Sequence, residues 1–109
     1  MNQVEQIKHE GYLTIDNMFE VEDVAEMKRH IFRVIEQGHP GIVYEKDGTT
    51  VRGLHGLQLD DEYFNKLTRH PVFVQLAQEY IGESVYVHQF KINVKKRMIG
   101  QAWPWHEDF

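Results

Sequence analysis

The side chains with the clearest potential for chemistry are a histidine and an aspartate separated by one residue, His106 and Asp108. In a strand, side chains two positions apart point the same way, so the imidazole and the carboxylate would face one point. Such a pair supplies two of the three ligands in the two-histidine, one-carboxylate triad that holds non-haem Fe(II). Because His-x-Asp is common by chance, a surface histidine beside an unrelated acid is the alternative interpretation.

The residues just before this pair favour an enclosed position. Trp103, Pro104 and Trp105 precede His106 directly. Large aromatic side chains normally lie in cores or pockets, where their apolar surface is removed from water. An exposed loop would leave both tryptophans in solvent, which argues against an exposed position, but the motif by itself leaves both interpretations open.

A row of polar side chains in the strand predicted over residues 85–94 is the second candidate. Gln89, Lys91 and Asn93 alternate with apolar residues and would share one face, with roughly 7 Å between neighbours. The opposite face would pack on the helices and carries Tyr86, His88, Phe90, Ile92 and Val94. The polar row is either a solvated sheet face or the lining of a site in which a lysine and two amides orient a charged ligand.

The elements that position these residues alternate between helices and short strands. Apolar spacing and capping residues predict helices over residues 3–10, 21–37, 60–67 and 72–81. A short strand is predicted over 12–15, and a hairpin joins 42–44 to 51–54. Asp47-Gly48 forms its turn.

Two details of the later helices are predicted as well. Asp60 is the expected N-cap of the third helix, and Pro71 suits the first position of the fourth. The buried face of the fourth helix is expected to comprise Phe73, Leu76, Ala77, Tyr80 and Ile81.

The other histidines divide into two groups. His55 lies between glycines in Gly53-Leu54-His55-Gly56, where it either faces a site or closes a turn. The remaining four lie in or at the ends of polar helical stretches, where surface positions are expected: His9, His30, His39 and His70.

Composition restricts the function classes. The 109 residues suffice for one domain, with 41% hydrophobic residues and no cysteine, which excludes disulfides and thiolate metal sites. Seventeen acidic against 12 basic residues give a net charge of −5, which argues against a nucleic-acid partner. The apolar runs are too short for a membrane span and no secretory signal is visible, so a cytoplasmic location without a membrane partner is expected.

Three blocks of the sequence resemble the phytanoyl-CoA dioxygenase superfamily of Fe(II)/2-oxoglutarate oxygenases, and particularly its bacterial proline- and ectoine-hydroxylase-like branch. The first block is 45–56, with Glu45-Lys46-Asp47-Gly48, Val51-Arg52 and Leu54-His55-Gly56. The second is 85–93, and the third is Trp103-Pro104-Trp105-His106-Glu107-Asp108-Phe109.

The resemblance implies roles for residues already singled out by their chemistry. His106 and Asp108 match two iron ligands, and a carboxylate at 108 implies hydroxylation rather than halogenation. The positions that match 2-oxoglutarate contacts are Asn93, Gln89 and Trp103. The positions that match substrate contacts are Gln89, Lys91, Arg52 and His55. The implied cofactor is Fe(II), the cosubstrates are 2-oxoglutarate and O₂, and the implied substrate is a free amino acid or similar zwitterion.

The implied fold is α+β: outer helices and first strands of a double-stranded β-helix, a jelly-roll or cupin-like barrel that is incomplete at its C-terminal side. Residues 1–109 would be the N-terminal part of one oxygenase domain without an internal boundary. Relatives carry a second histidine ligand and a 2-oxoglutarate-binding arginine further along, so this chain alone is expected to be inactive. Two alternatives stay open: a non-catalytic helix-and-strand interaction module or remnant, and a zinc-dependent hydrolase that uses His106 and Asp108.

Overall fold

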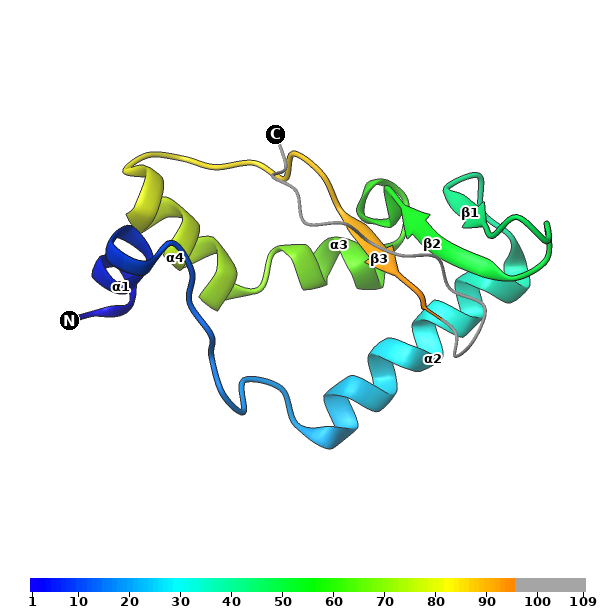
Figure 1. Ribbon diagram of the computed structural model, residues 1–109, viewed down its shortest axis with the longest axis horizontal. Coiled ribbons are helices and arrows are strands. Elements are labelled where there is room, and N and C mark those ends of the chain that lie inside the picture. Colours follow the sequence, from blue (N-terminus) through cyan, green and yellow to red (C-terminus); the bar gives the residue numbers. More distant parts are fainter. Residues whose placement is uncertain (96–109) are drawn as a thin grey trace.

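The computed structural model describes residues 1–95 of the chain (Figure 1). Its elements, in order, are the helices α1 (Gln3–Glu10) and α2 (Val21–Gln37), the strands β1 (Ile42–Tyr44) and β2 (Val51–His55), the 3₁₀ helix η1 (Leu57–Leu59), the helices α3 (Glu62–Thr68) and α4 (Pro71–Ile81), and the strand β3 (Lys91–Asn93). Within these residues no helix is long and apolar enough to cross a membrane.

The first two helices begin and end where their sequences predict. The Asn2 side chain accepts a hydrogen bond from the Glu5 backbone N–H at 2.8 Å, which satisfies a free donor in the first turn of α1. Gly11 ends α1 in the left-handed conformation at φ 87°. Gly38, likewise at positive φ, ends α2, and its N–H bonds the Val34 carbonyl. The predicted bounds of both helices are therefore confirmed.

The three strands form one antiparallel sheet in the order β1-β2-β3. The hairpin between β1 and β2 turns at Asp47-Gly48, as predicted. The Asp47 carboxylate accepts hydrogen bonds from the backbone N–H groups of Thr49 at 2.9 Å and Thr50 at 2.8 Å. It also accepts from the Thr50 hydroxyl, and these bonds lower the pKa of Asp47 to about 2 because they stabilise its charged form.

A β-bulge changes the direction of the side chains in the first half of β2. Val43 pairs with Gly53, but the next residue of β1, Tyr44, pairs with Val51, so Arg52 is the extra residue. In a bulge, two neighbouring side chains can lie on the same side of the sheet. That arrangement explains why Val51 packs against the core, on the face of Leu54.

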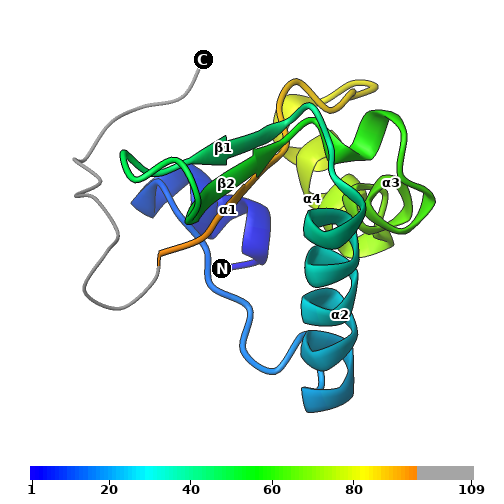
Figure 2. The same cartoon turned by 90° about the vertical axis from the view of Figure 1, so that its right-hand side faces the viewer.

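The core lies where the sheet meets α2 and α3, which both lie on one side of it (Figure 2). The fully buried apolar residues are Val34, Leu54, Leu57 and Phe64. Phe90, Ile92 and Val94 pack against them, so the predicted apolar face is confirmed for the second half of the 85–94 segment. Tyr86 does not join it, because its side chain is 84% exposed.

Several sequence expectations are wrong in extent. Residues 12–15 form no strand, and the strand predicted over 85–94 is limited to 91–93. The physical reason is that β2 ends at His55 and the chain turns at Gly56, whose N–H bonds the Phe90 carbonyl at 3.0 Å. Beyond that bond, β2 offers no further backbone groups with which residues 85–89 could pair.

The start of α3 and the packing of α4 also differ from expectation. Asp61, and not Asp60, caps α3, because its side chain accepts from the Phe64 N–H. Pro71 occupies the first turn of α4 as predicted. However, no residue of α4 is fully buried: Phe73 is 40%, Tyr80 49% and Ile81 57% exposed. An apolar stripe is buried only where another element covers it, and little of the α4 stripe is covered.

Candidate functional site

The open face of the sheet brings together three of the predicted site residues. In the β2–β3 ladder, His55 pairs with Lys91 and Gly53 pairs with Asn93. Directly paired residues of an antiparallel sheet lie side by side on one face. The side chains of His55, Lys91 and Asn93 are all exposed there, while the alternating Leu54 and Ile92 face the core.

Gly53 lies beneath these side chains and is buried although they are exposed. A Cβ atom built on Gly53 would lie 3.8 Å from His55 Nε2 and 4.0 Å from Asn93 Oδ1. It would also lie 3.0 Å from the Ile92 carbonyl oxygen, which is closer than an ordinary contact. Glycine at this position therefore permits the close approach of β3 to β2.

The chemistry of this group suits an anionic ligand better than a metal ion. Lys91 supplies a cation, His55 can donate from its ring, and the Asn93 amide both donates and accepts. A carboxylate is the complementary partner for such a set. Within residues 1–95, no group of three or more histidine, aspartate or glutamate side chains is arranged to hold a metal ion.

Comparisons with known proteins show the family of the chain. The model of the family described as phytanoyl-CoA dioxygenase (PhyH) matches residues 7–109. The chain belongs to the phytanoyl-CoA dioxygenase family. It is 38% identical over 100 residues to an L-proline trans-4-hydroxylase of Streptomyces griseoviridis, a match covering 92% of this chain and 37% of that protein.

Other relatives are named for a different activity. The chain is 32% identical over 108 residues to an ectoine dioxygenase of Streptomyces anulatus, covering 94% of this chain and 36% of the relative. A second ectoine dioxygenase, from Stutzerimonas stutzeri, is 28% identical over 110 residues, with 97% and 36% covered. The chain thus spans little more than a third of the length of the curated relatives it matches.

The predicted site residues of this phytanoyl-CoA dioxygenase family chain are not all brought together. Gln89 is exposed, but it precedes β3 and has no strand partner among the described residues. Arg52 is half-buried at the bulge, and alternation assigns it to the face of Leu54 rather than that of Gly53. Trp103, His106 and Asp108 lie outside the described residues.

The expectation that His30, His39 and His70 are plain surface residues is wrong. His30 stacks on Tyr63 with ring centroids 3.8 Å apart and accepts a hydrogen bond from Arg33. His39 and His70 join neighbouring segments. His39 Nε2 lies 2.9 Å from the Asp60 carboxylate and its Nδ1 accepts from the Gly41 N–H, whereas the His70 Nδ1 accepts from the Val72 N–H and caps α4.

The group around His30 connects α2 to α3. Arg33 donates to the Asp61 carboxylate at 2.7 Å. Partial burial acts to raise the pKa of Asp61, but the bonds from Arg33 and from the α3 backbone outweigh it, and the pKa is lowered. Burial, together with the charges of Glu26 and Asp23, raises the pKa of the Tyr63 phenol. These contacts are structural, because each group already has its partner inside the fold.

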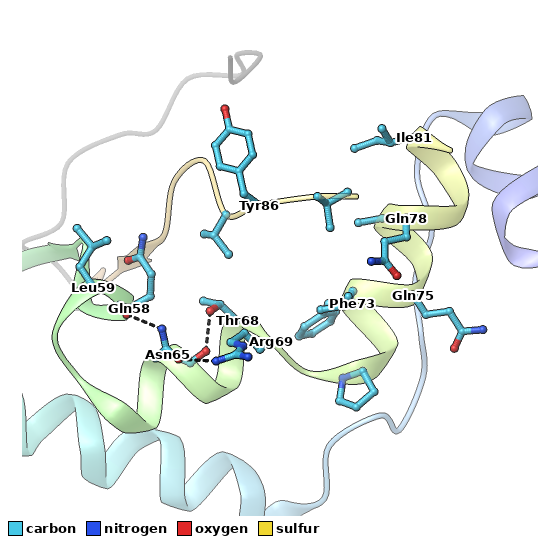
Figure 3. Close-up of a pocket in the computed structure, with 15 residues that line it drawn as sticks. Gln58, Leu59, Asn65, Thr68, Arg69, Phe73, Gln75, Gln78, Ile81 and Tyr86 are labelled. Atoms are coloured by element: carbon cyan, nitrogen blue, oxygen red, sulfur yellow. Dashed lines mark hydrogen bonds between the residues drawn. The ribbon is translucent and has the colours of Figure 1, made fainter. Parts of the chain in front are cut away.

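Two hollows among the described residues lie beside the helices, outside the open sheet face. The larger is a groove of about 1000 Å³ between α3, α4 and residues 85–87. Figure 3 shows Leu59 and Asn65 near one end, Ile81 near the other, Arg69 and Phe73 between them, and Tyr86 pointing away from the helices. The smaller lies between α2 and α3 beside His30 and Tyr63. Neither contains residues that the sequence selects for chemistry.

Within the described part of the chain, two buried acceptor atoms have no hydrogen-bond partner, Glu45 Oε2 and Gln58 Oε1. Their residues are 6% and 8% exposed. Sequence reasoning selected neither side chain as a site residue, and it also missed the close approach of β3 at Gly53. The signal for that approach was a glycine inside a predicted strand, which often marks a close approach of a ligand or of another backbone.

Proposed function

We propose that this chain is part of a non-haem Fe(II)/2-oxoglutarate-dependent dioxygenase that hydroxylates a small amino-acid-like substrate, such as a proline-like or ectoine-like zwitterion. The observation that carries the proposal is the juxtaposition of His55, Lys91 and Asn93 over Gly53 on the open sheet face. Residues 1–109 then belong to one oxygenase domain, and the three-stranded sheet belongs to a double-stranded β-helix.

His106 and Asp108 would hold the metal in this proposal. An imidazole nitrogen and a carboxylate oxygen are the donor types that a two-histidine, one-carboxylate Fe(II) site requires. Bound Fe(II), with 2-oxoglutarate and O₂, supplies the oxidising chemistry for an unactivated C–H bond. A carboxylate ligand at 108 occupies a coordination position that halogenation would need for chloride, so hydroxylation is the expected outcome.

The open sheet face would bind and orient the organic ligands. Asn93, with Gln89 and Trp103, would contact 2-oxoglutarate, and the Asn93 amide can donate to one of its oxygens. Lys91 would attract the substrate carboxylate, and His55 would donate from its ring. Arg52 would contact the substrate from the bulge at the start of β2.

Ligand titrations followed by NMR test the proposal on the chain itself. We expect 2-oxoglutarate and L-proline, titrated separately, to shift the resonances of His55, Lys91 and Asn93. Asn93→Ala should weaken 2-oxoglutarate binding and Lys91→Met should weaken binding of the substrate carboxylate. Lys66→Met is the matched control, because it removes an exposed lysine of α3, which packs on the other face of the sheet.

The metal is tested separately by anaerobic titration with Fe(II) and with Zn(II). Binding of Fe(II) that is lost in both His106→Ala and Asp108→Ala supports the ligand pair. Tight zinc binding with the same dependence would instead favour the hydrolase alternative. A chain that binds neither metal nor organic ligand would contradict the proposal and favour a non-catalytic interaction module.

A further inference from the structure

The outer edge of β3 is open in the part of the chain that the structure describes. β3 is the last strand in the sheet order, so only β2 lies beside it there. The Val94 N–H donates to the Arg52 carbonyl of β2 at 2.8 Å. Because the backbone groups of an antiparallel strand point alternately to its two sides, those of Lys91 and Asn93 point away from β2.

Residues 85–89 prolong this edge as an extended segment between α4 and β3 (Figure 1). Among residues 1–95, none forms a backbone hydrogen bond with this segment. The segment is also accessible, since Tyr86 is 84% and Val87 40% exposed. Unpaired N–H and C=O groups on an accessible edge are a template with which another strand can pair.

The sequence of this segment lacks the residues that protect an open edge. Such edges commonly carry lysine or proline, or contain a bulge that turns them away from a partner. Residues 84–90 read SVYVHQF and contain no Lys, Arg, Asp, Glu, Pro or Gly. Valine, tyrosine and phenylalanine favour strands. An exposed run of this composition is prone to pair with another copy of itself.

The charges at the two ends of this run are complementary. Glu83 precedes it and Lys91 follows it, and both residues are exposed. If two copies pair antiparallel about a two-fold axis at Val87, residues equally far before and after Val87 lie opposite each other. Glu83 of each copy then lies opposite Lys91 of the other copy. Opposite charges at directly paired positions stabilise a sheet.

We propose that residues 83–91 form a self-association site, at which two copies of this chain pair edge to edge as antiparallel strands about a two-fold axis at Val87. A second copy fits this surface because the surface offers unpaired backbone groups and a charge pattern complementary to itself. Ile81, which is 57% exposed and borders the same groove as Val87, enlarges the apolar surface that the second copy can cover. The inference does not depend on the proposed function.

Sedimentation velocity of the 109-residue chain over a range of concentrations tests the proposal. We expect an equilibrium between monomer and dimer in the parent chain. Val87→Lys places two like charges opposite each other at the axis, so it should weaken dimerisation by roughly tenfold or more. Val21→Lys is the matched control, because it adds the same charge at an 83% exposed position of α2. It should dimerise as the parent chain does.

An exchange of charges tests the register of the two strands. Glu83→Lys and Lys91→Glu each replace the opposite-charge pairs of the dimer by like-charge pairs, so each should weaken dimerisation by roughly tenfold. The double variant restores opposite charges and should recover the dimerisation constant of the parent chain. Both positions are exposed, so this test decides the question if a thermal melt shows that Val87→Lys does not fold.

Several results would overturn the proposal. The first is a parent chain that stays monomeric at every concentration. The second is a dimerisation constant that is unchanged in folded Val87→Lys, because another surface would then form the contact. Assembly beyond the dimer would also contradict it, since a two-fold contact uses the same surface on both copies and closes. Failure of the double variant to recover dimerisation would overturn the pairing of Glu83 with Lys91.

Discussion

The half of the molecule built on the sheet and α3 differs sharply from the half built on α1 and α4. Among residues 1–95, the four buried apolar side chains all lie where the sheet meets α2, η1 and α3: Val34, Leu54, Leu57 and Phe64. Neither α1 nor α4 contains a buried residue, although the two helices pack on one another (Figure 1).

The difference shows that an amphipathic sequence is not sufficient for burial. The α4 stripe has helical spacing, yet Tyr80 and Ile81 are 49% and 57% exposed because one helix and an extended segment cover little of it. Leu54 and Leu57 are fully buried because a strand, two helices and a 3₁₀ turn surround them. Tertiary partners decide which apolar residues form the core.

Two phenylalanines provide the largest test of this comparison. Phe64 is 1% exposed and its ring lies 5.1 Å from that of Tyr63 and 5.8 Å from that of Phe90. Phe64→Ala should cost about 3–5 kcal/mol of the free energy of unfolding, from lost burial and the cavity left behind. Phe73→Ala, in α4 at 40% exposure, should cost about 1 kcal/mol.

Urea denaturation followed by circular dichroism measures both values. Equal losses in the two variants would show that the α4 half is as well packed as the sheet half in solution. Such a result would contradict the comparison.

The sequence predicts local structure well where one residue type decides it. Gly11 and Gly38 end their helices because glycine readily adopts positive φ. Asp47-Gly48 forms the hairpin turn for a similar reason. The strand length over 85–94 could not be predicted, because it depends on where β2 ends and not on the β-propensity of those residues.

Loss of the residue that caps α3 and contacts α2 should have an intermediate effect on the free energy of unfolding. Asp61 both caps α3 and accepts from Arg33, with a side chain only 13% exposed. Asp61→Ala should therefore cost about 1–2 kcal/mol of the free energy of unfolding. Asp60→Ala is the matched control, because its side chain is 59% exposed and loses only a surface pair with His39, worth about 0–1 kcal/mol.

Urea denaturation of the two variants shows which contact connects α2 to α3. If Asp60→Ala is the more destabilising, the connection between α2 and α3 runs through His39 rather than through Arg33. The adjacent acids also illustrate a limit of sequence reasoning: both can cap a helix, and only the position of the Phe64 N–H distinguishes them.

The candidate site was predictable in part. Lys91 and Asn93 lie on the open face because strand alternation is regular there, and His55 joins them through its pairing with Lys91. The bulge at Arg52 could not be predicted, since it depends on the register of two strands and leaves no clear mark in one of them. The close approach of β3 to Gly53 likewise depends on how the two strands pair.

The smallest expected effect is on the pH dependence of stability, to which the hairpin between β1 and β2 contributes. Three hydrogen bonds hold the pKa of Asp47 at about 2, below the ordinary value of 3.8. Because the pKa is lowered in the folded state, this contribution is fully present above pH 3.8 and is lost as the pH falls towards 2. Asp47→Asn should therefore show a flatter decline in stability between pH 4 and pH 2 than the parent chain.

Thr50→Val isolates the cause within that same turn. It removes the hydroxyl donor to Asp47, which is the largest source of the shift, but keeps the two backbone donors. Its decline in stability over this pH range should lie between those of the parent chain and Asp47→Asn, as measured by urea denaturation at a series of pH values. Identical slopes in all three proteins would mean that the turn opens before it titrates. In that case the order of the sheet would depend on the buried side chains of Leu54 and Phe64 and not on its hairpin. The two halves of the molecule would then differ in their cores but not in their surfaces.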